Sequence, residues 1–336
     1  MMNKKIRQWI IVLILLIMSL LLVSFLALAF GSSQIPITDI IDIIMNQKET
    51  ASYHILMGIR LPRIIIAIAV GGSLGLAGTL LQGMFRNPLV EPYTLGISGG
   101  ASLGVCLTII FGLHARIGVV AYPLSGFMGA GLVIFAVYVL SLESGALKQH
   151  SMLLTGVMIS FVSSSLVMLL MAVSKSDDLH NIIFWIMGSL DEPNLTLITI
   201  VSIGALLGLV ISLFHCHSLN ALALGEEQAT FLGVNTTRTQ KILFITASML
   251  TGLSVSVAGI IMFVGLIVPH FMRLVIGADY RILVISSFLG GAVFLILCDL
   301  FARIIISPLE LPVGVITGII GGIVFIYVLG KKQVRL

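Results

Sequence analysis

Long apolar runs without a single charged residue recur along the whole chain, and they constrain its fold more than any other feature. An α-helix needs about 20 apolar residues to cross the hydrocarbon core of a bilayer. Runs of roughly that length therefore predict an all-α polytopic membrane protein. The runs are Trp9–Phe30, Ile64–Phe85, Pro92–Leu113, Ile117–Leu142, Ser151–Ser174, Pro193–Phe214, Ile242–Pro269, Ile282–Cys298 and Leu311–Gly330.

Composition agrees with a membrane protein. Hydrophobic residues make up 58% and charged residues 10% of the 336 positions, whereas soluble domains carry roughly 25% charged residues. The net charge of +4 is better explained by basic residues that fix the topology on the cytoplasmic side than by an anionic partner such as nucleic acid. Three scattered cysteines, Cys106, Cys216 and Cys298, do not indicate a disulfide framework.

The run Ile242–Pro269 is too long for one upright span and too short for two ordinary ones. Because Gly259, Gly265 and Pro269 lie inside it, we divide it into a span and a short broken helix that reaches about Ile276. Non-helical backbone at this depth is tolerated only when it is buried in protein or lines a cavity. The division gives about ten transmembrane helices.

Ten spans put both termini on the same side of the membrane. Twice as many of the 18 Lys and Arg residues then lie on the cytoplasmic side as outside. Nine spans would place Lys331, Lys332 and Arg335 outside, against the positive-inside tendency. We therefore predict that both termini are cytoplasmic.

We interpret residues 1–336 as a single transmembrane permease domain. Lys4, Lys5 and Arg7 before the first apolar run imitate a signal peptide, but that run exceeds the usual 7–15 residues, so we predict an uncleaved first span. The predicted order is a first span at 9–30, an external excursion at 31–62, spans 2–6 within 64–214, a cytoplasmic coupling loop at 215–241 and spans 7–10 within 242–330.

Glycines recur at four-residue intervals on two predicted spans. Such faces let helix backbones approach closely in a membrane, where lipid supplies little hydrophobic drive for association. They predict close packing, either within one bundle or at a subunit interface. The glycines are Gly96, Gly100 and Gly104 on the third span and Gly314, Gly318 and Gly322 on the tenth, with Gly71 and Gly75 as a pair on the second.

The chain lacks the groups that would supply energy for transport. No G-x-x-x-x-G-K-[ST] nucleotide loop occurs. Ion-coupled carriers usually keep ionisable residues near the membrane midplane, and the span interiors here hold almost none. Asp299 and Arg303, four residues apart near the outer end of the ninth span, could pair. We expect no enzymatic activity and a separate ATPase partner; an ion-coupled secondary carrier is the alternative.

The coupling loop could receive that partner. Polar residues alternate with apolar ones around two glycines that permit sharp turns, so we predict a short amphipathic helix between Gly225 and Gly233. A solvated loop is the plain alternative. The residues assigned to ATPase coupling are Leu224, Gly225, Glu226, Glu227, Ala229, Leu232 and Gly233.

Three arginines are expected on the outer face. Arg60 and Arg63 flank Pro62 at the start of the second span, and Arg303 follows the ninth. Guanidinium groups form bidentate pairs with carboxylates, so we predict that these arginines dock an acidic protein surface. Lipid headgroup contacts for Arg60 and Arg63, and the Asp299 pair for Arg303, are the alternatives.

Other polar residues indicate less. The triplet His215-Cys216-His217 resembles a metal tract, but a closed site usually needs four ligands, and we predict no bound metal or cofactor. His270 at a helix end is expected to be structural. Hydroxyl groups on the fifth span could line a pathway or satisfy helix carbonyls; they belong to Thr155, Ser160, Ser163, Ser164 and Ser165.

Seven motifs, in order, resemble those of the iron-complex and cobalamin permease family (FecCD-like), the transmembrane subunits of type II ATP-binding-cassette importers. The resemblance covers nearly the whole chain beyond the first span. The motifs are RLPR (60–63), NPLVEP (87–92), LGISGGASLG (95–104), FWIMGSL (184–190), LGEEQATFLGV (224–234), FVGLIVPHFMR (263–273) and ELPVGVITGIIGG (310–322).

The resemblance implies ten helices in each of two identical or similar permease subunits, with the pathway between them. It implies two ATPases docked from the cytoplasm on the Gly225–Gly233 helix, and one external binding protein that meets Arg60, Arg63 and Arg303. A cobalamin member of the family uses small hydroxyl residues as an inner gate before the fifth span. This chain has Gln149-His150-Ser151 there, followed by Ser160 and Ser164 as further candidate pathway residues.

The family also implies a location and a cargo. We expect a multi-pass protein of a bacterial or archaeal cell membrane, the inner membrane where there are two, in contact with lipid. The expected function is import of an iron–siderophore-type complex, or of haem or cobalamin, by alternating access.

Overall fold

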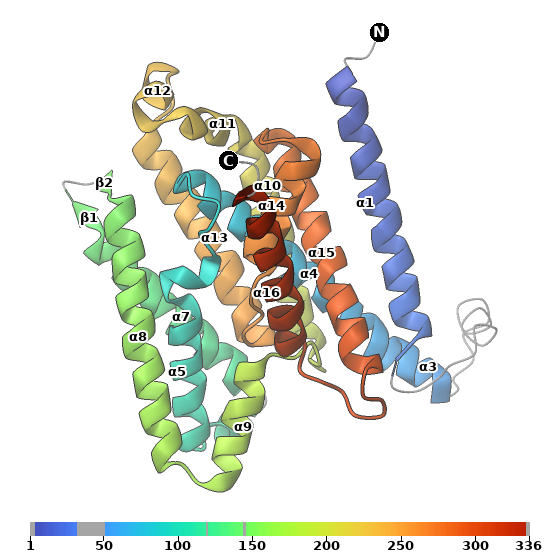
Figure 1. The fold of residues 1–336 in the computed structure, drawn as a ribbon. Helices are drawn as coiled ribbons and strands as arrows, with labels where there is room; N and C mark the ends of the chain where they lie inside the picture. The colour runs from blue at the N-terminus through green and yellow to red at the C-terminus, as the bar shows by residue number, and fades with distance from the viewer. Residues whose placement is uncertain (1–3, 32–50, 119, 144–145, 334–336) are drawn as a thin grey trace.

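The computed structural model describes residues 4–31, 51–118, 120–143 and 146–333, and these parts are almost entirely helical. The only strands described are β1 (Leu142–Glu143) and β2 (Ala146–Leu147), which pair antiparallel. Figure 1 shows the long helices packed side by side into one bundle. The predicted all-α class is confirmed.

Seven described helices are long and apolar enough to cross a membrane. One of them combines α3 (Ala51–Ile55), a π-helical turn (Leu56–Arg60) and α4. Three further helices contain shorter apolar stretches, and the stretch in α16 is Val313–Tyr327. The seven are α1 (Lys4–Ala29), α4 (Leu61–Met84), α7 (Ala121–Leu140), α8 (Gln149–Val173), α10 (Leu195–Phe214), α13 (Thr236–Ala258) and α15 (Tyr280–Ile304); the further three are α5 (Ile97–Ile110), α14 (Val264–Ile276) and α16 (Val313–Gln333).

The remaining elements connect these helices. They are a 3-10 turn (Pro92–Leu95), α6 (His114–Ile117), α9 (Ser176–Met187), α11 (Cys216–Leu224) and α12 (Glu226–Phe231). The twelve-residue α9 is an element that the sequence analysis did not predict.

Helix α4 forms the centre of the bundle and is buried along nearly its whole length. It packs against α10, α13, α14 and α15. Gly71 and Gly75 lie against the backbone carbonyls of Gly291 and Ser287 on α15, and a Cβ atom at either glycine would collide with those oxygens. Glycine at these two positions therefore permits the close crossing of α4 and α15.

The break that was predicted after the seventh span lies between α13 and α14. Helix α13 ends at Ala258, and α14 runs from Val264 to Ile276, the predicted end. Gly259 and Phe263 have φ values of +67° and +69°, which stop one helix and start the next in another direction. The backbone between them is irregular.

Two other boundaries differ from the predicted ones. The second long helix begins at Ala51 rather than Ile64, because the π-helical turn carries the helix through Arg60 and Pro62 fits the first turn of α4. Helix α5 begins at Ile97 because Gly96 adopts a left-handed conformation with φ +81°. Of the predicted excursion at 31–62, residues 51–62 are helical and continue into α4, and residues 32–50 lie outside the described residues.

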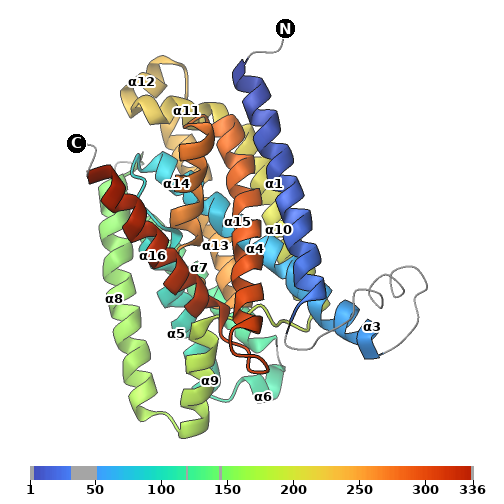
Figure 2. The ribbon, with the colours of Figure 1, turned by 45° about the vertical axis from the view of Figure 1, so that its right-hand side comes forward.

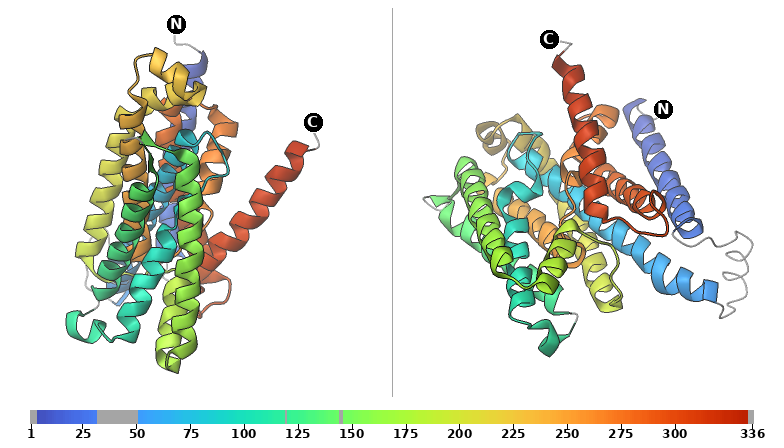
Figure 3. Two further views of the ribbon diagram at one scale, coloured as in Figure 1. Left: turned by 90° about the vertical axis from the view of Figure 1, so that its left-hand side faces the viewer. Right: turned by 60° about the horizontal axis from the view of Figure 1, so that its bottom comes forward.

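The bundle has two distinct ends. Helix α1 begins, and α16 ends, at the end that carries α11 and α12, which we call the coupling end (Figures 1 and 2). The π-helical turn and the connection between α15 and α16 lie at the opposite end, the arginine end. Helix α16 is tilted away from the other long helices (Figure 3).

Candidate functional site

The three arginines that were predicted to dock a partner come together at the arginine end; we call them the outer arginine cluster. Arg63 Nε donates a hydrogen bond to Asp299 Oδ1 at 2.8 Å, and Arg303 Nε lies 3.0 Å from Asp299 Oδ2. A single carboxylate thus bridges arginines of α4 and α15. The pair between Asp299 and Arg303 is the one that their spacing predicted.

Two further kinds of acceptor surround these arginines. Arg63 Nη1 lies 2.6 Å from Glu310 Oε2 in the connection between α15 and α16. Arg60 donates to the carbonyls of Leu28 and Ala29, and Arg303 Nη1 donates to the carbonyl of Ala27. These carbonyls end α1, where the helix dipole favours cations. The cluster therefore also anchors the end of the first helix.

The outer arginine cluster is almost completely buried. Arg60, Arg63 and Arg303 expose 3%, 6% and 3% of their surface. The side chain of Asp299 is 2% exposed, whereas that of Glu310 is 36% exposed. Within the described residues, Glu310 is the ionic partner through which this network reaches the surface.

The predicted coupling segment folds as two short helices at the opposite end. Gly225 and Gly233 have φ values of +131° and +83° and bracket α12, where an amphipathic helix was predicted. Ala229 is fully buried, whereas the side chains of Leu224, Phe231 and Leu232 are 66%, 90% and 64% exposed. An exposed apolar face of this kind is typical of a protein contact.

The structure joins two groups of residues that the sequence treated separately. Glu226 Oε1 accepts hydrogen bonds from Gln149 Nε2 at 2.8 Å and from Gln240 Nε2 at 2.9 Å. Gln149 is the first residue of α8 and a candidate gate residue, and Gln240 belongs to α13. His150 is exposed and Ser151 is half-buried beside it.

Hydroxyl groups of α8 do not form one uniform stripe. Ser160 donates to the carbonyl of Gly156 at 3.0 Å, as a helix-satisfying serine does. Ser163 is buried against Gly99 of α5, and Ser164 lines a cavity of about 410 Å3 between α5, α8 and α9. Ser165 is exposed and Thr155 is half-buried.

The predicted glycine faces divide into tight and open positions. Gly100 and Gly104 of α5 lie against carbonyls of α7, and Gly314 lies against the carbonyls of Met187 and Ile260. In contrast, Gly318 and Gly322 of α16 meet only side-chain atoms at ordinary contact distance.

A clamp that the sequence analysis missed holds the break between α13 and α14. Glu91 Oε1 accepts a hydrogen bond from the backbone N–H of Phe263 at 2.7 Å. The Tyr93 hydroxyl donates to the carbonyl of Ile261 at 2.9 Å and accepts from its N–H at 3.1 Å. The sequence offered one signal for this clamp, because Glu91 and Tyr93 flank Pro92 beside an apolar run and such polar groups need hydrogen-bond partners there.

The histidine and cysteine tract does not form a cluster. Cys216 is buried, and its Sγ lies 3.4 Å from His217 Nδ1, while His215 Nδ1 lies 2.9 Å from the carbonyl of Ile211. Within the described ranges, no three His, Cys, Asp or Glu side chains are placed to hold a metal ion.

Comparison with known proteins gives the family. The model of the FecCD transport family matches residues 15–331. The chain is a member of that family. It is 35% identical to the hemin transport system permease protein HmuU of Yersinia pestis over 95% of this chain and 96% of the relative. It is 38% identical to the Fe(3+) dicitrate transport system permease protein FecD of Escherichia coli over 84% and 86%.

The fold of this FecCD member also matches a solved relative. A structure described as an inward-facing metal-chelate type ABC transporter aligns with a TM-score of 0.83 and 29% identity, covering 96% of this chain and 99% of that one. The FecCD member is therefore a transport permease component with several membrane-spanning helices.

Proposed function

We propose that the chain is the transmembrane permease subunit of an ATP-driven importer. On this proposal it moves an iron–siderophore-type complex, or haem or cobalamin, from an external binding protein into the cytoplasm by alternating access. The observation that best supports this proposal is the family match along residues 15–331. Relatives that share a third or more of their residues are named as permeases for hemin and ferric dicitrate.

The ten apolar helices would each cross the membrane. Seven meet the length and hydropathy of a span, and α5, α14 and α16 would complete the set of spans. The coupling end would face the cytoplasm, with both termini there, and the arginine end would face outside. The chain would then lie in the cell membrane of a bacterium or archaeon, the inner one where there are two.

A separate ATPase would dock on the exposed apolar face of α12. Closure of two such ATPases would move Leu224, Phe231 and Leu232, and the hydrogen bond from Gln149 to Glu226 would pass this motion to the start of α8. The coupling residues Gly225, Glu227, Ala229 and Gly233 shape or flank that helix. Candidate gate and pathway residues lie on α8, which links the ATPase contact to the route of the cargo.

An external binding protein would dock at the arginine end. Because Asp299 is buried, an incoming carboxylate would replace Glu310 as the second partner of Arg63. Glu310→Gln removes that competitor and should tighten the association of the binding protein. Association measured on immobilised permease in nanodiscs tests this step, and an unchanged dissociation constant would contradict docking through Arg63.

A second permease, identical or similar, would pair through the exposed apolar surfaces of α8 and α16. Phe161 and Val162 on α8 and Ile319, Ile323 and Ile326 on α16 are more than half exposed. Among the described residues, Gly318 and Gly322 of α16 have no tight neighbour. These faces would otherwise meet lipid.

The decisive test is reconstitution. The permease, its ATPase and its binding protein are placed in liposomes, and uptake of radiolabelled iron–siderophore, haem and cobalamin is measured with and without ATP. We expect ATP-dependent uptake of one cargo class. Uptake driven by an ion gradient without ATPase would show a secondary carrier instead.

A further inference from the structure

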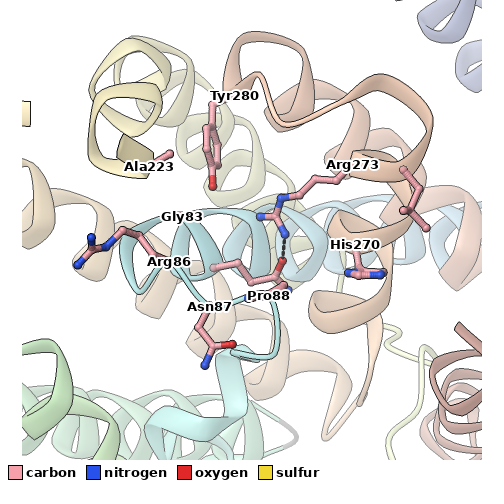
Figure 4. Close-up of a pocket in the computed structure, with 10 residues that line it drawn as sticks. Gly83, Arg86, Asn87, Pro88, Ala223, His270, Arg273 and Tyr280 are labelled. Atoms are coloured by element: carbon pink, nitrogen blue, oxygen red, sulfur yellow. Dashed lines mark hydrogen bonds between the residues drawn. The ribbon is translucent and has the colours of Figure 1, made fainter. Parts of the chain in front are cut away.

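A second group of cationic side chains lines a cavity at the coupling end. The cavity measures about 360 Å3 and lies between the end of α4, α11, α14 and the start of α15. Figure 4 shows Arg86 and Asn87 just after α4, His270 and Arg273 on α14, and Tyr280 on α15 around this space. Cavities that hold small molecules begin at about this size.

The described residues that line this cavity include no carboxylate. Among the described residues, neither Arg86 nor Arg273 forms an ion pair, although Arg281 close by is paired with Asp279 at 2.6 Å. Hydrogen bonds from Arg281 lower the pKa of Asp279 below its usual range, so this carboxylate is already engaged. The positive charge of the cavity is therefore not neutralised by the described protein.

Arg273 is oriented by a buried amide rather than by a counter-charge. Its Nη1 donates to Gln82 Oε1, a contact drawn in Figure 4. The Gln82 Nε2 group donates in turn to the carbonyls of Gly265 and Leu266 at 3.2 and 3.3 Å, and Gln82 is only 2% exposed. A hydrogen bond from Arg273 to the Tyr280 side chain also holds the guanidinium. The remaining N–H groups of the five on this guanidinium could bind a ligand.

Arg86 is held in an unusual backbone conformation. Its φ value is +50°, which a residue with a side chain rarely adopts. One of its Nη atoms lies 3.7 Å from the point where a Cβ atom would stand at Gly225. The second guanidinium therefore extends from the cavity toward the junction of α11 and α12.

We propose that this cavity is a binding site for an oxyanion, either a carboxylate or a phosphate. Guanidinium groups recognise both through paired, charge-assisted hydrogen bonds, and the Tyr280 hydroxyl and Asn87 amide add neutral donors. The exposed apolar side chains of Leu274, in the lining, and Leu224, close to it, would suit the organic part of such a ligand. The ligand is a small soluble carboxylate or the phosphate headgroup of an anionic lipid. This site is additional to the proposed transport function.

Two binding experiments distinguish a small soluble anion from the headgroup of an anionic lipid. The purified full chain is placed in nanodiscs of pure phosphatidylcholine and titrated calorimetrically with citrate and with inorganic phosphate. In parallel, chain from membranes containing phosphatidylglycerol is analysed by native mass spectrometry for retained lipid. We expect either saturable anion binding or one or more retained phosphatidylglycerol molecules.

Charge-removing variants locate the site. The double variant Arg86→Gln and Arg273→Gln should lower the affinity for the anion by about tenfold or more. Arg238→Gln, an exposed residue of the first turn of α13 outside the cavity, removes one charge at the same end and should change nothing. Arg86→Gln alone should weaken binding without affecting the fold, because Arg86 is exposed and no described hydrogen bond involves its side chain.

Two results would overturn the proposal. One is a wild-type chain that binds neither citrate, phosphate nor phosphatidylglycerol. The other is an unchanged affinity in the double variant. Weaker association of the ATPase in the double variant, with no anion bound by the wild type, would assign the arginines to an acidic protein surface instead. All of these outcomes are read from binding measurements and not from ATP-dependent uptake, so the proposed function is tested separately by reconstitution.

Discussion

The two groups of arginines differ in how their charge is balanced. The outer arginine cluster is buried and shares the carboxylates of Asp299 and Glu310 together with the terminal carbonyls of α1. The cavity at the coupling end holds Arg86 and Arg273 without a described carboxylate partner. Both groups look alike in the sequence, as arginines at helix ends. The difference shows that the partner of a charge, and not its position on a helix, decides whether it is available for binding.

The largest effect should follow from breaking the outer network. Asp299→Asn would leave two buried guanidinium groups without their shared carboxylate. Removal of one partner from a buried ion pair costs about 3–5 kcal/mol, so we expect a large fall in the thermal unfolding midpoint in detergent. Fluorescence-detected size-exclusion chromatography after heating measures it. A midpoint close to that of the wild type would show that the network does not stabilise the fold.

The next effect concerns the cavity at the coupling end. If an oxyanion binds there, citrate or phosphatidylglycerol at about 100 times its dissociation constant should stabilise the chain by about 2.7 kcal/mol. The double variant Arg86→Gln and Arg273→Gln should abolish this ligand-dependent shift. Its unliganded midpoint should also fall, because the buried Gln82 Oε1 loses the hydrogen bond from Arg273, so the test compares the midpoints of each variant with and without ligand. Stabilisation that survives in the double variant would place the anion elsewhere, and the contrast between the two ends would fail.

Contacts of the outer arginine cluster could be predicted from the sequence only where the two partners lie close together along the chain. The Asp299 and Arg303 pair was predictable because four residues separate two positions on one helix face. Arg63 and Asp299 are 236 residues apart in the sequence, so no local pattern indicates their contact. The burial of the three arginines could not be predicted from the sequence either, because it depends on the position of the end of α1. Their role in docking stays a prediction.

The helices themselves were more accessible to prediction. Apolar runs located the long helices, and Gly259 located the break before α14, whereas Gly265 and Pro269 lie inside that helix. The pattern missed α9, whose charged first turn follows Lys175, and it missed the clamp from Glu91 and Tyr93 to the irregular backbone. Such contacts depend on tertiary structure, because each partner lies in a different part of the chain.

A smaller effect tests whether the coupling end transmits motion through Glu226. Glu226→Ala and Gln149→Ala should each reduce ATP-driven uptake by severalfold while the ATPase remains bound. Because the two residues share one hydrogen bond, the double variant should lose little more than either single one. Additive losses would show that Glu226 and Gln149 act independently and that their hydrogen bond does not transmit the motion.

The smallest effect on stability should come from Glu310→Gln. The side chain of Glu310 is 36% exposed, so water screens its pairing with Arg63, and exposed pairs contribute about 0–1 kcal/mol. Asp299 remains bound to the same guanidinium in this variant. The unfolding midpoint of Glu310→Gln should therefore stay close to that of the wild type and well above that of Asp299→Asn. Equal losses in the two variants would mean that Glu310 is as integral to the fold as Asp299, and a docking carboxylate could not replace it without unfolding the arginine end.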